Sequence, residues 1–300
     1  MSKSYAAESA PVIHHYKIKR RKPNRSLGGD IGVYSVVFLF SFIMVFPMIY
    51  SICQSFKPLD ELLKFPPTVF PRNPTTDNFS DLFVIMSQSW VPFSRYIFNT
   101  LFVTVVGTVG HVIIASMAAY VLAKYRFPLG DAFFRIVVVA LMFVGYVTFI
   151  PNYIIMCRLH IVDTYWAIIL PAFVAPMGLF LMKQFMEGFP MAIIEAAKID
   201  GAHEWKIFMN LVMPNVKPAW LTISVFSINA LWNNPQTQYI YTEAKKMLVY
   251  ALNTIQTGNL VARQGMANAV MVVTLSVPII FFLFSQSQIM ETMATSGLKD

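Results

Sequence analysis

The stretch EAAKIDGAHEWKIFMNLVMP, Glu195–Pro214, is charged and compact, yet it lies between two long apolar runs of the chain. The residues MAIIEAAKI, which lead into this stretch, are good helix formers. Pro190, directly before them, suits a first helical position because its missing N–H would be unpaired there. Gly201 can adopt the left-handed backbone that ends a helix and redirects the chain. A second short helix is expected over 202–213. The pattern predicts two short helices that meet at a glycine elbow and project from a membrane.

The composition around this stretch is that of a membrane protein. Hydrophobic residues make up 56% of the 300 residues and charged residues 13%, with a mean hydropathy of +0.57. Soluble domains carry about 25% charged residues, so most of this chain contacts lipid or other helices. A span needs about 20 mainly apolar residues and must be helical, because lipid cannot satisfy free backbone groups. An all-α polytopic membrane protein is predicted, with six spans: Ile31–Phe56, Tyr96–Ala123, Ala132–Cys157, Tyr165–Lys183, Ala219–Tyr239 and Ala267–Ile289.

Lysine and arginine are unevenly distributed between the two sides of these spans. Fourteen lie on the side of the N-terminal tail, which contains HHYKIKRRKPNR, and eight lie on the other side. Since cytoplasmic loops carry the excess of positive charge, both termini are predicted to be cytoplasmic, and so is the loop that holds Glu195–Pro214. The net charge of +8 does not indicate nucleic-acid binding, because the basic residues gather in one tail and the rest is too apolar.

The outer loops have a character of their own. The Pro-rich stretch KPLDELLKFPPTVFPRNPTTDNF is expected to be extended. Phe79, Phe83, Met86 and Trp90 then recur at helical spacing, which predicts a short amphipathic helix at the outer interface. Another surface helix is expected at MLVYALNTIQTG. The predicted organisation is a basic cytoplasmic tail (1–30) and one transmembrane domain (31–300), with a first span (31–56), an outer loop (57–95), a core (96–290) that includes the cytoplasmic loop 186–217, and a C-terminal tail (291–300).

The cytoplasmic loop admits two interpretations. Ile193, Ile194 and Ala197 are expected to share one stripe of its first helix. The adjacent alanines, Ala196 and Ala197, allow close approach of another surface, and Glu195 offers a charge to a basic partner, which favours docking to a cytoplasmic protein. The alternative is an ordinary helix among lipid headgroups. Such helices usually place Lys and Arg along the polar face, whereas this one mixes acids and bases, and the residues alone leave the two interpretations about equal.

The spacing in this loop resembles a known signature. Glu195-Ala196-Ala197, then Gly201, then Leu211 and Met213-Pro214 are similar to the EAA signature of inner-membrane permeases in binding-protein-dependent ABC importers, with Leu and Met where Ile and Leu are usual. The stretches NTLFVTVVG, IPNYIIMCRLHIVDTYWAIILP and FLMKQFMEGFP resemble the carbohydrate-importing branch. Within that branch, the chain looks like the second, six-span permease of a two-permease pore.

The resemblance implies a permease fold of the type I ABC importer kind and a transport subunit rather than an enzyme. The implied partners are a second homologous permease, two copies of a cytoplasmic ABC ATPase and an extracytoplasmic solute-binding protein, in a bacterial cytoplasmic membrane. ATP and magnesium would be bound by the ATPase, since this chain has no G-x-x-x-x-G-K-[ST] stretch and calls for no cofactor of its own. The implied cargo is a sugar or oligosaccharide. The residues implied in ATPase coupling are Glu195, Ala196, Ala197, Asp200, Gly201 and Pro214.

Polar residues inside the predicted spans are candidates to line a solute pathway. Thr104, Thr108 and His111 lie in the second span, where such groups either face a cavity or form hydrogen bonds between closely packed helices. Trp232 and Asn233 lie near the end of the fifth span. The tryptophan could stack on a sugar ring while the asparagine bonds its hydroxyls, or the tryptophan could anchor the span at the membrane interface.

Other classes of protein lack their required residues. An ion-coupled secondary transporter, the main alternative, would need a buried acidic or cationic relay near mid-span, and the six predicted spans contain none. An intramembrane enzyme would need paired Asp or a Ser/His set inside the spans, which is also missing. The histidines have no metal-ligand spacing, so no metal is expected. Cys53 and Cys157 are expected to be unpaired, although a bridge between them is conceivable.

Overall fold

The structure, a computed structural model, describes residues 27–87, 91–143, 145–235, 238–256 and 264–296. By its internal contacts the chain forms two units, residues 1–48 and 49–300. The first unit contributes most of α1 (Leu27–Ser55), a 29-residue helix. Within its residues Gly28–Ser55, an 18-residue window has a mean hydropathy of 2.4. The helix therefore corresponds closely to the first predicted span.

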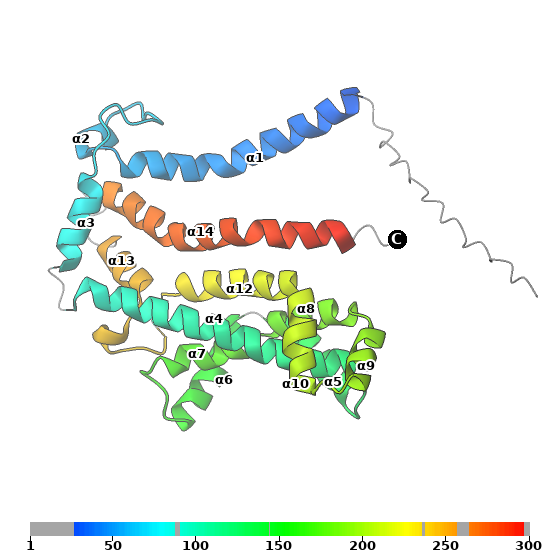
Figure 1. The fold of residues 1–300 in the computed structure, drawn as a ribbon. Coiled ribbons are helices and arrows are strands. Elements are labelled where there is room, and N and C mark those ends of the chain that lie inside the picture. The colour runs from blue at the N-terminus through cyan, green and yellow to red at the C-terminus, as the bar shows by residue number, and fades with distance from the viewer. Residues whose placement is uncertain (1–26, 88–90, 144, 236–237, 257–263, 297–300) are drawn as a thin grey trace, which may run out of the picture. The chain divides into compact units, whose positions relative to one another are not determined.

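The second unit is a bundle of helices around α4 (Phe93–Lys124), and the described residues contain no strand, which confirms the all-α prediction. The long α4 runs unbroken because its 32 residues are mainly apolar and include no proline. It packs against α8 (Pro176–Glu187), α12 (Lys217–Trp232) and α7 (Trp166–Phe173), and α12 packs in turn on α14 (Gln264–Ser296). Figure 1 shows α4 running alongside α12 and α7.

The number of spans remains a prediction. In the described part of the chain, four helices are long and apolar enough to cross a membrane: α1, α4, the stretch of α7 and α8 (Trp166–Glu187) and α14. A fifth would be formed by Glu204–Asn215 together with Lys217–Trp232, which are bent by 79° at their junction. These elements correspond to five of the six predicted spans.

The third predicted span, Ala132–Cys157, is not one helix. The structure divides it into α5 (Gly130–Ala140) and α6 (Gly145–Arg158). At about 1.5 Å per residue neither piece reaches the roughly 30 Å of a hydrocarbon core. The break lies just before Gly145, whose backbone is costly to order in a helix interior, and Pro151 removes a further helical hydrogen bond from α6.

The fifth predicted span ends earlier than expected. We predicted Ala219–Tyr239, but α12 ends at Trp232. The physical reason is the sequence Asn233-Asn234-Pro235, because a residue before proline is driven away from helical geometry and asparagine competes for backbone hydrogen bonds.

The outer loops are more ordered and more buried than the sequence indicated. The Pro-rich stretch is not extended: it folds around α2 (Leu59–Leu62), with Lys57 only 1% exposed and donating to the Thr68 carbonyl, while Glu61 accepts the Arg72 N–H at 2.9 Å. Two predicted short helices are present, α3 (Asp77–Ser87) and α13 (Leu248–Gln256). The second is not a surface helix, because its Leu248 and Leu252 are buried in a core cluster. Trp90 and the side chain of Met86, both predicted for the α3 face, lie outside the described residues.

Candidate functional site

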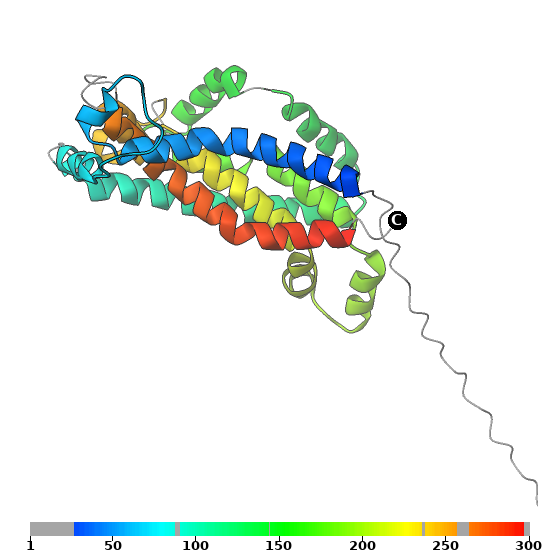
Figure 2. The same cartoon turned by 90° about the horizontal axis from the view of Figure 1, so that it is seen from above.

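A bent arm follows α8 and contains the stretch that carries the resemblance. We define the bent arm as residues 191–215: α9 (Met191–Ile199), α10 (Glu204–Ile207), the π-helical turn η1 (Phe208–Val212) and α11 (Met213–Asn215). Figures 1 and 2 both show α9 and α10 at the end of the bundle opposite α2, α3 and α13. The loop predicted as cytoplasmic and the loops predicted as external therefore lie at opposite ends of this unit.

The elbow of the arm is built as the sequence predicts. Gly201 has a φ of +78°, the left-handed conformation. Its N–H donates to the Lys198 carbonyl at 3.0 Å, and the Ala202 N–H donates to the Ala197 carbonyl at 2.9 Å. These two bonds form a Schellman motif, which satisfies the last carbonyls of a helix and stops it. Pro190 differs slightly from its predicted place, because it precedes the first helical residue as the cap of α9.

The second half of the arm is tied to the bundle through a distorted helix. The π-helical turn comes directly before Met213-Pro214. Such turns insert an extra residue into a helix and occur frequently at functional sites. After Asn215 the chain bends by 79° into α12. Only Val216 separates the two helices, so the arm continues directly into α12.

The two faces of the arm differ sharply in burial. Ile194 is 0% exposed, and it joins Ile207 and Val212 in a core cluster with residues of α4 and α8. Elsewhere on the arm Ile199 is 87% exposed, and Trp205, which lines a groove with Tyr120 and Tyr125, is 55% exposed. Of the predicted coupling residues, Ala197 is half-buried and the rest are exposed: Glu195, Ala196, Asp200, Gly201 and Pro214.

Two details of the exposed face bear on docking. Ile193, predicted to share the stripe of Ile194, is exposed instead, because neighbours in a helix point about 100° apart. Glu195 makes no hydrogen bond or ion pair with any residue that the structure describes. The exposed carboxylate thus faces solvent rather than a described neighbour.

A polar cluster that the sequence did not indicate links the arm to the end of α4. Lys198 Nζ lies 2.5 Å from Glu204 Oε1 and donates to the Tyr125 hydroxyl at 3.2 Å. The Tyr120 hydroxyl donates to Glu204 Oε2 at 3.1 Å. The hydrogen bond to Glu204 raises the pKa of Lys198, so its ammonium group is charged at neutral pH.

The candidate pathway residues on α4 are all buried. His111 Nδ1 lies 2.7 Å from the Ser227 hydroxyl, a serine–histidine pair inside the spans that the sequence analysis did not expect, and Nε2 lies 3.3 Å from the Ala175 carbonyl oxygen. Since that carbonyl can only accept, Nε2 carries the proton and Nδ1 accepts from Ser227. His111 and Ser227 line a cavity of about 390 Å³. The hydroxyls of Thr104 and Thr108 are buried without a hydrogen-bond partner in the described part of the chain.

The two candidates at the end of α12 lie in a different place. Trp232 is buried, and its indole N–H donates to the Thr274 carbonyl of α14 at 2.9 Å. The side-chain amide of Asn233 donates to Asn229 Oδ1 at 3.2 Å. Neither lines the His111 cavity. In this conformation the tryptophan holds α12 on α14.

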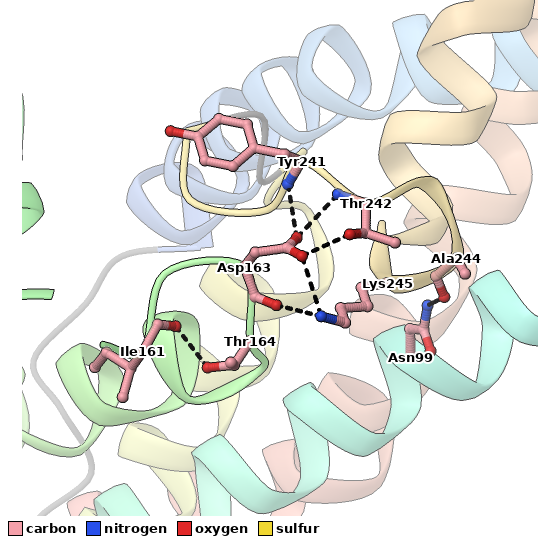
Figure 3. Close-up of polar contacts among 8 residues, drawn as sticks. All are labelled: Asn99, Ile161, Asp163, Thr164, Tyr241, Thr242, Ala244 and Lys245. Atoms are coloured by element: carbon pink, nitrogen blue, oxygen red, sulfur yellow. Dashed lines mark hydrogen bonds and ion pairs between the residues drawn. The ribbon is translucent and has the colours of Figure 1, made fainter. Parts of the chain in front are cut away.

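A carboxylate clamp, also missed by the sequence reasoning, organises the opposite end of the bundle (Figure 3). Asp163 has a φ of 59° and accepts the N–H groups of Tyr241 and Thr242, both at 2.9 Å, while Lys245 Nζ lies 3.1 Å from its Oδ2. Burial alone would raise the pKa of Asp163, but these hydrogen bonds outweigh it and hold the pKa well below its usual range. Asn99 of α4 donates to the Ala244 carbonyl at 2.9 Å, so α4 is bound to the same segment.

An apolar helical bundle with several helices long enough to cross a membrane defines a polytopic membrane protein. Residues 111–291 match the family model described as "Binding-protein-dependent transport system inner membrane component", which covers more than half of the chain. The chain belongs to this family. It is an inner-membrane transport component and not an enzyme, and the family leaves the ion-coupled secondary transporter without support.

Individual relatives agree with this assignment. The chain is 31% identical over 265 residues to an arabinooligosaccharides transport system permease protein, AraQ, of Halalkalibacterium halodurans, which covers 86% of this chain and 92% of the relative. It superposes with a TM-score of 0.72 and 23% identity on a chain of a bacterial ABC transporter involved in the import of the acidic polysaccharide alginate, over 89% of this chain and 99% of that one. A structure of the alginate transporter with an alginate pentasaccharide-bound periplasmic protein gives a TM-score of 0.58 and 15% identity, over 87% and 96%.

Proposed function

We propose that this chain forms half of the pore of an ATP-driven, solute-binding-protein-dependent importer. A second, homologous permease completes the pore. The bent arm docks on a cytoplasmic ABC ATPase, of which the assembly holds two copies, and the ATP and magnesium are bound there. A solute-binding protein delivers the cargo from outside, and both termini of this chain are cytoplasmic.

The observation that carries this proposal is the asymmetry of the bent arm. One face is fixed in the core of the bundle through Ile194, Ile207 and Val212. The rest of its surface presents a carboxylate without a partner among the described residues, a small residue and large apolar side chains, namely Glu195, Ala196, Ile199 and Trp205. Exposed apolar patches rimmed by polar residues are typical of protein-binding surfaces. A lipid-facing helix would carry basic residues along its polar edge instead.

The cargo and the outer partner are proposed from the relatives. The AraQ relative is named for arabino-oligosaccharides, and the structural neighbour imports alginate, a polysaccharide. The alginate transporter has also been solved with its periplasmic protein. A sugar or oligosaccharide is therefore the proposed cargo of this chain, and an external sugar-binding protein is its proposed source.

The proposed pathway follows α4. Support comes from the buried hydroxyls of Thr104 and Thr108, which have no partner among the described residues, and from His111, which lines a cavity that the two threonines do not reach. Buried hydroxyls without a partner are costly, so a hydrated solute or water that reached them would be stabilised there. Trp232 and Asn233 would join the pathway only in a conformation that separates α12 from α14.

Charge reversal at Glu195 tests the docking. In Glu195→Lys the arm should fold normally, since the side chain has no partner in the described chain, but the basic partner group would now be repelled. We expect the subunit to reach the membrane in normal amounts and to lose the co-purifying ATPase by about tenfold or more, in line with buried charge contacts at interfaces. Transport should be lost with it.

Asp81→Lys is the matched control, because Asp81 is an exposed acidic residue of α3 at the other end of the bundle. It should leave ATPase recovery unchanged. Full recovery of the ATPase with Glu195→Lys would argue against docking through this face.

A further inference from the structure

We propose that Lys198, Glu204 and Tyr120 form a latch that fixes the angle of the bent arm and ties both of its halves to α4. They are positioning residues: their role is to pass movement of α9 to the helix that carries the pathway candidates. The inference rests on the proposed function, in which the arm receives that movement from an ATPase. It adds a specific mechanical link that the docking itself does not require.

The elbow gains from such a link because glycine itself restricts the backbone little. The Schellman bonds stop α9, but they do not set the direction of α10, and Gly201 has no side chain to restrict it. Nothing lies within 4 Å of the position that a Cβ of Gly201 would occupy. The ion pair from Lys198 on α9 to Glu204 at the start of α10 spans this open elbow at 2.5 Å. The pair therefore adds a polar tie across the elbow to the apolar packing of Ile194, Ile207 and Val212.

The same two charges are also held by α4. Glu204 uses its second carboxylate oxygen to accept the Tyr120 hydroxyl, and Tyr120 is buried near the end of α4. Lys198 uses another N–H to reach Tyr125, which directly follows α4. The Tyr120 ring lies 5.4 Å from the ring of Phe208 in the second half of the arm. Each half of the arm is thus bound both to the other half and to α4.

The exposure of the ion pair indicates what the latch does. Lys198 and Glu204 side chains are 36% and 46% exposed, and ion pairs this exposed add little to stability because water screens them. The ion pair instead sets the geometry of the arm, because the two tyrosines hold each charged group in one place. His111 lies nine residues before Tyr120 on the same helix, so a push on the latch acts along α4 toward the cavity.

A charge swap tests the latch. The variants Lys198→Glu, Glu204→Lys and the double swap would be reconstituted with the ATPase and binding protein, and solute transported per ATP hydrolysed would be measured along with ATPase recovery. We expect each single variant to lower transport per ATP by about tenfold, a size typical of coupling between sites. The double swap should recover most of the lost transport per ATP, because tyrosine hydroxyls can both donate and accept hydrogen bonds.

Two further variants separate the possible failures. Lys217→Glu reverses an exposed charge at the start of α12, outside the bent arm, and should leave the ratio unchanged. Tyr120→Phe removes one hydroxyl without altering surface charge and should lower the ratio while ATPase recovery stays normal. Unchanged ratios in the single variants, or a double swap no better than either, would overturn the latch but leave docking intact. Failure of the unmodified chain to recover any ATPase would instead overturn the proposed function.

Discussion

Replacing Gly201 with valine is expected to abolish transport while leaving the subunit in the membrane. The backbone at this position has a φ of +78°, where a β-branched residue is strongly disfavoured. Left-handed geometry costs an L-residue about 1–2 kcal/mol, and more when the side chain is branched. The chain would escape the strain by breaking the two hydrogen bonds that stop α9. The elbow would then open, and the exposed face of the arm would lose its shape.

A substitution series isolates this backbone effect. A Cβ at position 201 would meet nothing within 4 Å, so side-chain collisions do not contribute. Asparagine tolerates the left-handed region, whereas alanine does so less readily. Transport normalised to inserted protein should therefore fall in the order glycine, Gly201→Asn, Gly201→Ala, Gly201→Val. If Gly201→Val transported solute as well as the unmodified chain, or Gly201→Asn transported the least of the three variants, the left-handed elbow would not be required for transport.

The second large effect is expected at Gly178, where α8 packs on α4. A Cβ there would lie 2.1 Å from His111 Nε2 and 2.7 Å from its Cε1. The imidazole cannot retreat without losing its bonds to Ser227 and the Ala175 carbonyl. Overpacking of this kind commonly costs about 1–3 kcal/mol. Gly178→Ala should therefore lower the thermal stability and the yield of folded subunit.

Gly188→Ala is the control for this substitution. A Cβ at position 188 would lie 3.5 Å from the Phe185 carbonyl oxygen, an ordinary contact distance, and the backbone of Gly188 is right-handed. It should be close to neutral. Combining Gly178→Ala with His111→Ala should cost less than the sum of the two single changes, because the second removes the collision. Strict additivity in the thermal stabilities would contradict the contact between Gly178 and His111.

Sequence reasoning succeeded where the signal is local. The spans within α1, α4 and α14 follow from long apolar runs, and the elbow follows from one glycine after a run of helix formers. The same reasoning kept Ala132–Cys157 as one span, whereas the structure divides it into two helices. Its apolar run is long enough for a span, and whether Gly145 and Pro151 break a helix depends on the residues packed around them.

Contacts between distant residues had no signal in the sequence. Tyr120 and Glu204 are 84 positions apart, and Asp163 and Thr242 are 79 apart, so no spacing rule joins them. The helix α13 shows a related limit. Leu248 and Leu252 have the spacing of one apolar face, and that pattern is the same whether the face meets a membrane surface or a protein core. The exposed face of the arm was predictable because small residues, an acid and a glycine stand together there.

Crosslinking from position 196 tests most directly whether the bent arm seats on an ATPase. Ala196 is small and exposed, and Cys53 and Cys157 are free thiols that can first be replaced by serine. With Ala196→Cys and a short thiol-directed crosslinker in membranes that hold the whole assembly, we expect one adduct between this chain and the ATPase, with a yield that changes when ATP binds. A cysteine at exposed Asp60 of the opposite end should give no such adduct. If position 196 reacts only with lipid or with the solute-binding protein, the bent arm is not the site of coupling.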